Sequence, residues 1–227
     1  MAGWVFLAGG GGARDSRPLD KQFARALAGG TLSYWPVALD PATHDYGECF
    51  AWLRGIYEPL GVRRISMWTG DRPIYPADYQ GIYIGGGNTY RLLSIIRRWN
   101  LLEQLREFVS GGGMVFGGSA GAALLGADIT TTAHLDRNDV GLTDTQGADL
   151  AAGHGVFVHH QDSDLPREIV WSATYRRPAI ALTERANAVA AGSTITAIGP
   201  DPLIMVDQRG CRRLAPGATS YDGLSVQ

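Results

Sequence analysis

Short apolar runs alternate along this chain with longer amphipathic stretches. The apolar runs predict buried strands at residues 4–8, 34–38, 64–67, 81–84 and 114–116. Between them, apolar positions recur at helical spacing, as at residues 92–99, where Asn88 or Thr89 is well placed to cap a helix. Strands separated by helix-length segments are typical of parallel βαβ units. We therefore predict an α/β fold with a doubly wound, mostly parallel sheet flanked by helices.

The pattern changes in the last quarter of the chain. Short apolar runs separated by turn residues predict strands at residues 179–183, 188–191, 194–199 and 203–207. We expect these strands to be antiparallel additions at one edge of the sheet. The polar stretch at residues 130–149 is predicted to be a loop, and a loop of that length is usually functional or mobile. No shift in composition marks a boundary, so residues 1–227 are expected to form a single domain.

Composition and charge narrow the class of protein. Hydrophobic residues make up 45% of the chain and charged residues 19%, which is the balance of a globular protein. Twenty Lys and Arg against 22 Asp and Glu give a net charge of −2, so no nucleic-acid partner is expected. No run approaches the length of a membrane span, the first residues do not resemble an export signal, and Cys49 and Cys211 form no close pair. We expect a cytoplasmic protein without membrane attachment.

Three glycine clusters lie beside predicted strands, at residues 9–12, 85–87 and 111–113. None matches the dinucleotide fingerprint G-x-G-x-x-G, and the chain contains no G-x-x-x-x-G-K-[ST] phosphate loop. We therefore predict no cofactor, and interpret most of these glycines as residues that permit tight strand-to-helix turns.

A different glycine-rich segment surrounds a serine. Gly117-Gly118-Ser119-Ala120-Gly121 follows a predicted strand and precedes a small-residue segment that could begin a helix. A G-x-S-x-G sequence at such a turn is typical of a nucleophile elbow, which exposes the serine oxygen. The backbone N–H of Ala120 would then face a developing oxyanion. The alternative is a glycine-rich turn with an incidental serine.

A serine nucleophile needs a base and a carboxylate that orients it. His159 and His160 end a predicted strand at residues 155–158, and strand alternation points only one of the two toward the elbow. Glu184 follows the strand at residues 179–183 and is the leading carboxylate; its competitors are Asp136, Asp139, Asp162 and Asp164. The histidine pair with Asp162 and Asp164 also suggests a metal site, but this spacing matches no strong zinc template, so no metal is predicted.

Two sequence blocks resemble the peptidase E and cyanophycinase-like serine peptidases, whose fold is similar to that of class I glutamine amidotransferases. Residues 84–93, IGGGNTYRLL, are similar to the family's GGGNT turn and helix, and residues 117–122, GGSAGA, are similar to its serine elbow. Residues 129–132 resemble the threonine-rich segment that follows the elbow. The glutamine amidotransferase activity itself requires cysteine at the position of Ser119.

The resemblance implies roles for particular residues. Ser119 would be the nucleophile, His160 the base and Glu184 the carboxylate, with His159 as the nearby alternative base. Backbone N–H groups of Ala120 and of the turn at Gly87 and Asn88 would form the oxyanion hole. Thr130, Thr131 and His159 would contact the substrate.

This chain also departs from the family pattern. The family histidine is usually followed by an aromatic residue, whereas Gln161 follows His160; and His134 stands where peptidase E has an aspartate that has been considered for its triad. Peptidase E carries an arginine where this chain has Thr130, which argues against strict preference for an N-terminal aspartate.

The resemblance implies a serine exopeptidase that hydrolyses dipeptides or short peptides, with a small peptide as its partner and a homodimer as a possible assembly. The alternatives are a cyanophycinase-like isopeptidase or esterase, and a binding module without catalysis.

Overall fold

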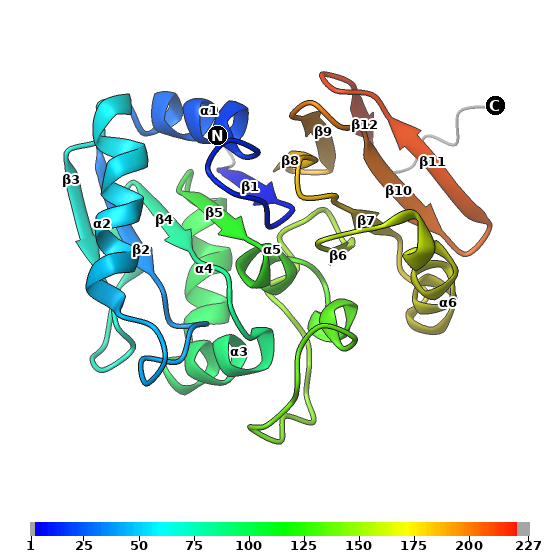
Figure 1. Cartoon of the computed structure of the whole chain (residues 1–227), viewed down its shortest axis with the longest axis horizontal. Coiled ribbons are helices and arrows are strands. Elements are labelled where there is room, and N and C mark those ends of the chain that lie inside the picture. Colours follow the sequence, from blue (N-terminus) through cyan, green and yellow to red (C-terminus); the bar gives the residue numbers. More distant parts are fainter. Residues whose placement is uncertain (1–2, 222–227) are drawn as a thin grey trace.

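The computed structural model describes residues 3–221 and contains a large sheet with helices on both faces (Figure 1). In that sheet five neighbouring strands are parallel and follow the order β3-β2-β4-β5-β1. Their bounds are β1 (Trp4–Ala8), β2 (Thr31–Trp35), β3 (Arg64–Met67), β4 (Gly81–Ile84) and β5 (Met114–Gly118). The predicted α/β fold with a mostly parallel sheet is confirmed.

The C-terminal strands divide between two sheets. Beyond β1 the large sheet continues with the antiparallel strands β8 (Asn187–Ala191), β9 (Thr194–Ile198) and β12 (Thr219–Tyr221). A second sheet has the order β11-β10-β7-β6 and contains β6 (Gly155–Phe157), β7 (Ala179–Ala181), β10 (Leu203–Asp207) and β11 (Gly210–Leu214). The expectation that all the late strands extend one edge is therefore wrong for β7 and β10. The pair β6–β7 is parallel and is connected through α6 (Leu165–Tyr175), which forms a separate βαβ unit.

Alternation along the strands sends side chains to two hydrophobic clusters. On β1, Val5 and Leu7 belong to a cluster with α3 (Thr89–Arg98), α4 (Leu101–Ser110) and α5 (Ala120–Leu125). Phe6 and Ala8 face the opposite cluster, with α1 (Arg17–Leu27) and α2 (Tyr46–Tyr57). The period of two in the sequence thus separates the helices into two layers. Four short 3₁₀ segments complete the elements of residues 3–221: η1 (Glu58–Leu60), η2 (Pro76–Asp78), η3 (Ile129–Thr132) and η4 (Asp162–Asp164).

The two sheets share buried side chains. Val115 of the large sheet and Val156, Ile180 and Met205 of the second sheet belong to the same hydrophobic cluster. A shared core is what a single domain requires, and the domain count itself stays a prediction. Within residues 3–221, no helix is both long enough and apolar enough to cross a membrane.

The parallel strands place the glycine-rich turns at one edge of the sheet. β1, β4 and β5 are neighbours in the same direction, so the segments that follow them meet at their carboxyl ends. In open α/β sheets this edge is where ligands bind. Ser119 lies there, directly after β5, with the turns at residues 9–12 and 85–87 on either side.

Candidate active site

Ser119 occupies a strained turn between β5 and α5. Its backbone angles are φ 50° and ψ −113°, a conformation that residues other than glycine rarely adopt. The neighbouring glycines make the turn possible: a Cβ on Gly117 would lie 2.5 Å from backbone atoms of Gly121, and one on Gly121 would lie 2.3 Å from the oxygen of Ile84. The chain can therefore reverse sharply only because these positions lack side chains, and the geometry is that of a nucleophile elbow.

His159 contacts the Ser119 side chain. Its Nε2 lies 2.9 Å from Ser119 Oγ, and its backbone N–H donates to the carbonyl oxygen of Gly9 at 2.9 Å. The imidazole ring rests on the turn that follows β1, since a Cβ added to Gly10 would lie 2.4 Å from Nε2. The ring is thus held between β1 and β5, within hydrogen-bond distance of the serine.

Glu184 stands on the other side of the same imidazole. Its Oε1 lies 3.3 Å from His159 Nδ1, while the Glu184 side chain is 63% exposed and that of His159 is 34% exposed. The structure therefore brings Ser119, His159 and Glu184 into one hydrogen-bonded row, with the carboxylate at its open end.

His160, which the resemblance favoured as the base, faces away from Ser119. Its Nδ1 lies 2.7 Å from Oε1 of Glu168 on α6, and both side chains are buried. The expected position of His160 beside the nucleophile is wrong, because alternation breaks at His159. That residue has φ 54°, so His160 turns to the α6 side, where Phe157 also packs, and His159 takes the side of Val156 and Val158.

The His160–Glu168 contact raises the pKa of a buried imidazole. Burial lowers the pKa of the His160 imidazole, but the hydrogen bond and the negative charge of Glu168 outweigh that effect. The pKa of His160 is consequently raised above its ordinary value, with smaller contributions from Asp164 and Asp162. His160 and Glu168 form a buried pair inside the second sheet and do not contact the serine.

Among the backbone N–H groups near Ser119 that have no acceptor within residues 3–221 are two that the sequence predicted for the oxyanion hole. They belong to Gly87, in the turn after β4, and to Ala120, the first residue of α5. Gly87 has φ 135°, and a Cβ there would lie 2.5 Å from backbone atoms of Ala38, so only glycine fits. Free N–H groups at a helix N-terminus and a tight turn are suited to bind an oxyanion.

Asn88 has a different role from the expected one. Its backbone N–H donates to the carbonyl oxygen of Ala38 at 2.9 Å, so it is not available to an oxyanion. Its side chain accepts from the N–H of Arg91 and donates to the carbonyl oxygen of Arg137. The expectation that Asn88 contributes to the oxyanion hole is therefore wrong; Asn88 caps α3, as the helical pattern indicated.

The expected substrate contacts of the threonine segment are also wrong for the side chains of Thr130 and Thr131. Thr130 Oγ1 donates to Asp128 at 2.7 Å and accepts from the indole N–H of Trp171 at 2.9 Å. Thr131 is fully buried. Asp128 caps the 3₁₀ segment η3, and this tight turn directs both hydroxyls into the protein. Thr132 instead borders the cavity beside Ser119.

A cavity of about 400 Å³ opens beside Ser119 and His159. It is bordered by Gly87, Thr89, Ser119, Thr132, Leu135, Asp136, Val158 and His159. Asp136, one of the competing carboxylates, does not contact the imidazole. Its Oδ2 accepts from the backbone N–H and the hydroxyl of Thr89, at 2.9 and 2.5 Å. The sequence signal for Asp136 was its position in the long polar loop after the elbow, but the pattern did not distinguish it from neighbouring acids.

The described residues contain no cluster of metal-ligating side chains. Among residues 3–221, no three His, Cys, Asp or Glu side chains are grouped so that they could hold a metal ion. In the histidine–aspartate run, His160 Nε2 lies 4.0 Å from Asp162 Oδ1, and His159 points to Ser119 instead.

A serine on a strained elbow, hydrogen-bonded to a histidine that a carboxylate approaches, is the arrangement found in serine hydrolases. Residues 5–196 match the model of peptidase family S51, and the chain therefore belongs to that family. Membership supports a peptidase-type function.

Relatives and solved structures agree with this placement. The chain is 34% identical over 129 residues to "Peptidase E" of Haemophilus influenzae, which covers 56% of this chain and 55% of that protein. It is 35% identical over 106 residues to "Peptidase E" of Streptomyces coelicolor, covering 46% and 42%. The matches thus span about half the length of these curated relatives. The crystal structure of a peptidase from an acI-B1 actinobacterium shares the fold, with a TM-score of 0.71 and 18% identity over 97% of both chains.

Proposed function

We propose that this protein is a serine exopeptidase that hydrolyses dipeptides or short peptides, with Ser119 as nucleophile, His159 as base and Glu184 as the group that orients the base. The observation that carries the proposal is the 2.9 Å contact between Ser119 Oγ and His159 Nε2 at a strained elbow. A nucleophile within hydrogen-bond reach of a base, which is oriented by a third group, is the general requirement of covalent acyl transfer.

The chemistry follows from this row of side chains. His159 Nε2 accepts the Ser119 hydroxyl proton as Oγ attacks the scissile carbonyl, and the same nitrogen returns that proton to the leaving amine. Glu184 accepts the Nδ1–H bond and stabilises the imidazolium that forms in between. Water, activated by His159, then hydrolyses the acyl-serine ester and restores the hydroxyl.

The backbone supports the charged intermediate. When the carbonyl carbon becomes tetrahedral, its oxygen acquires negative charge, and the free N–H groups of Gly87 and Ala120 are placed to bind it. The N-terminus of α5 adds positive potential at the same point. Because these donors are fixed before the reaction, they stabilise the transition state without reorganisation.

The cavity beside Ser119 supports a substrate with a free amino terminus. Asp136 is its ionisable wall residue besides His159, and Asp136 Oδ2 already accepts two bonds from Thr89. The other carboxylate oxygen is the group best suited to an N-terminal ammonium ion. None of the described residues that border this cavity is Lys or Arg, so an acidic N-terminal side chain gains no ion pair from them.

The experiment compares amine release by the wild type and by Ser119→Ala from a panel of dipeptides. N-terminal Ala, Leu, Lys and Asp are tested with one common second residue, together with β-aspartyl-arginine. We expect hydrolysis of the neutral substrates, weaker hydrolysis of the Asp substrate, and a loss on the order of 10⁶ in kcat in Ser119→Ala.

Each alternative function gives a different result in the same panel. Turnover of β-aspartyl-arginine alone would identify an isopeptidase. Binding of peptides without release of amine in the wild type would identify a binding module, and release that persists in Ser119→Ala would contradict the assigned nucleophile.

A further inference from the structure

A second pocket adjoins the nucleophile on the side of α2. It has a volume of about 400 Å³ and lies at the carboxyl ends of β2 and β4. Its walls are formed by Tyr34, Leu39, Glu48, Cys49, Trp52 and Tyr83, and it reaches the turn after β4 at Gly85 and Gly86. A Cβ on Gly86 would lie 3.2 Å from Ser119 Cβ and 3.7 Å from its Oγ. The pocket is therefore separated from the nucleophile by one glycine.

The pocket has rigid aromatic walls. The rings of Tyr34 and Tyr83 meet edge to face with centroids 5.7 Å apart, and Tyr83 also stacks on Phe116 at 4.5 Å. Across from them, Trp52 on α2 keeps 47% of its surface exposed. A large exposed aromatic residue that faces buried aromatic rings is suited to cover an apolar side chain.

Both tyrosine hydroxyls lack a partner. Tyr34 and Tyr83 are buried, and neither hydroxyl makes a hydrogen bond within residues 3–221. Burial raises the pKa of both phenols, so they stay protonated and act as donors. Tyr34 Oη lies close to the turn after β4, since a Cβ on Gly85 would be 3.4 Å away, and Tyr83 Oη lies close to the elbow, since a Cβ on Gly118 would be 3.4 Å away. Both hydroxyl oxygens are accessible from the pocket, and donors placed there are suited to a ligand that brings an acceptor oxygen.

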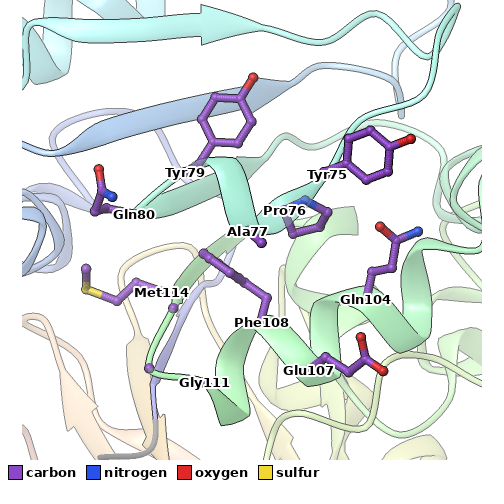
Figure 2. Close-up of a pocket in the computed structure, with 12 residues that line it drawn as sticks. Tyr75, Pro76, Ala77, Tyr79, Gln80, Gln104, Glu107, Phe108, Gly111 and Met114 are labelled. Carbon is purple, nitrogen blue, oxygen red and sulfur yellow. The ribbon is translucent and has the colours of Figure 1, made fainter.

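A larger cavity elsewhere lacks these features. This pocket has a volume of about 490 Å³. Figure 2 shows its lining, with Tyr75, Phe108, Gln80 and Met114 among the labelled side chains. Gln80 directly precedes β4 and Met114 begins β5, so this pocket lies at the amino ends of the strands. Ser119 is at the opposite ends, and the size of this cavity therefore gives it no connection with the nucleophile.

We propose that the α2-side pocket binds the residue that follows the scissile bond, with a large apolar or aromatic side chain between Trp52 and Leu39 and its carbonyl oxygen at the hydroxyls of Tyr34 and Tyr83. This inference rests on the proposed peptidase function. The Asp136 cavity lies on the side of α3 and η3, and the new pocket lies on the side of α2. A peptide that places its amino group at Asp136 and its carbonyl at Ser119 therefore directs its next residue into the pocket.

The charge of the pocket adds a second element of specificity. Among the described residues that border the pocket, Glu48 is the one carboxylate and none is Lys or Arg. An acidic side chain in this position would meet Glu48 without a compensating cation, and like charges at close range disfavour binding. The pocket thus selects large apolar residues over small ones and over acidic ones.

The test measures kcat/KM for the C-terminal amides of Ala-Phe, Ala-Ala and Ala-Glu, in which the second residue ends in a neutral carbonyl group. In the wild type we expect Ala-Phe to exceed Ala-Ala by about 10- to 100-fold, the range that apolar pockets achieve. Trp52→Ala should lower the rate for Ala-Phe about tenfold and leave Ala-Ala unchanged. Tyr34→Phe should lower kcat/KM for all three substrates by the same factor, because the Tyr34 hydroxyl contacts the main chain of the substrate. Glu48→Gln should raise kcat/KM for Ala-Glu alone.

A matched variant and a binding measurement separate the two proposals. Tyr75→Ala removes an exposed aromatic residue at the amino ends of the strands and should change no substrate. Calorimetric titration of the Ser119→Ala variant with Ala-Phe, with and without Trp52→Ala, measures the affinity of the pocket for this peptide in the absence of catalysis. Equal turnover of all three substrates, unaffected by Trp52→Ala, would contradict the proposed role of the pocket and still support the proposed peptidase function. If the wild type hydrolyses none of the three substrates but Trp52→Ala still weakens binding, the pocket proposal is supported and the peptidase proposal is contradicted.

Discussion

At the scale of single residues, one backbone angle decides which histidine serves Ser119. Strand alternation correctly predicted that only one of the pair would face the elbow, but it cannot predict the left-handed conformation of His159 that reverses the pattern. The resemblance favoured His160, although Gln161 follows it where the family usually has an aromatic residue.

The exposure of Glu184 predicts a limited contribution to catalysis. Loss of a buried triad aspartate costs about 10⁴ in kcat, but Glu184 is 63% exposed and approaches His159 at 3.3 Å, where water competes for the same bond. We expect Glu184→Gln to lower kcat by about 10- to 100-fold, measured on the best dipeptide of the panel. A loss as large as that of Ser119→Ala would show that the carboxylate closes onto the imidazole during turnover.

The buried pair of His160 and Glu168 predicts a dependence of stability on pH. Because the pKa of His160 is raised in the folded protein, its contribution is fully present below the ordinary value of about 6.5 and is lost as the pH rises through the raised value. Glu168→Gln should therefore lower the free energy of unfolding most near pH 5.5, by about 3 kcal/mol, and less as the pH rises.

Denaturant unfolding between pH 5 and 9 measures this profile. Asp162→Asn is the matched control, since that carboxylate is 88% exposed and 4.0 Å from His160 Nε2, and it should leave the profile nearly unchanged. A difference between the wild type and Glu168→Gln that grows with pH would contradict the direction assigned to His160.

At the scale of elements, the parallel strands and their helices were predicted closely, and the errors lie where apolar runs continue into buried loops. The strand predicted at residues 34–38 is β2 at Thr31–Trp35, because Val37 and Ala38 are buried in the following loop. That loop has a function of its own, since Ala38 accepts from Asn88 and packs against Gly87. A hydrophobic pattern records burial, and cannot separate a strand from a loop packed under a site.

The turn after β1 supports the His159 ring and can be tested separately from the triad. Gly10 has φ 107°, and a Cβ there would lie 2.3 Å from the imidazole Cε1. Gly10→Ala should displace the ring from Ser119 and lower kcat/KM by about 100-fold, with a loss of only about 1 kcal/mol in stability. Gly12→Ala is the matched control, because a Cβ on Gly12 would lie 3.8 Å from its nearest neighbour, Asp15 Oδ2. Equal activity of the two variants would show that the turn does not position the base.

At the scale of the whole molecule, the order of elements predicted the large sheet but not the second one. The apolar runs of β7 and β10 correctly predicted strands, but such a run does not specify which strand it pairs with. The second sheet matters for the site because β6 delivers His159 from one end of it and Glu184 follows β7 at the same end. The site is therefore assembled between two sheets, with the nucleophile from one and the base and carboxylate from the other. The possible homodimer stays a prediction.

The central claim is that His159, and not His160, activates Ser119. Its most direct test is the rate at which a fluorophosphonate labels Ser119, followed by intact mass and peptide mapping, because this rate requires no knowledge of the natural substrate. Variants His159→Gln and His160→Asn are compared with the wild type, with Ser119→Ala as the unlabelled control and circular dichroism as the check of folding. We predict a loss of at least about 10³-fold in His159→Gln and labelling within about tenfold of the wild type in His160→Asn. Labelling of His159→Gln at the wild-type rate, together with its loss in a folded His160→Asn protein, would contradict the account.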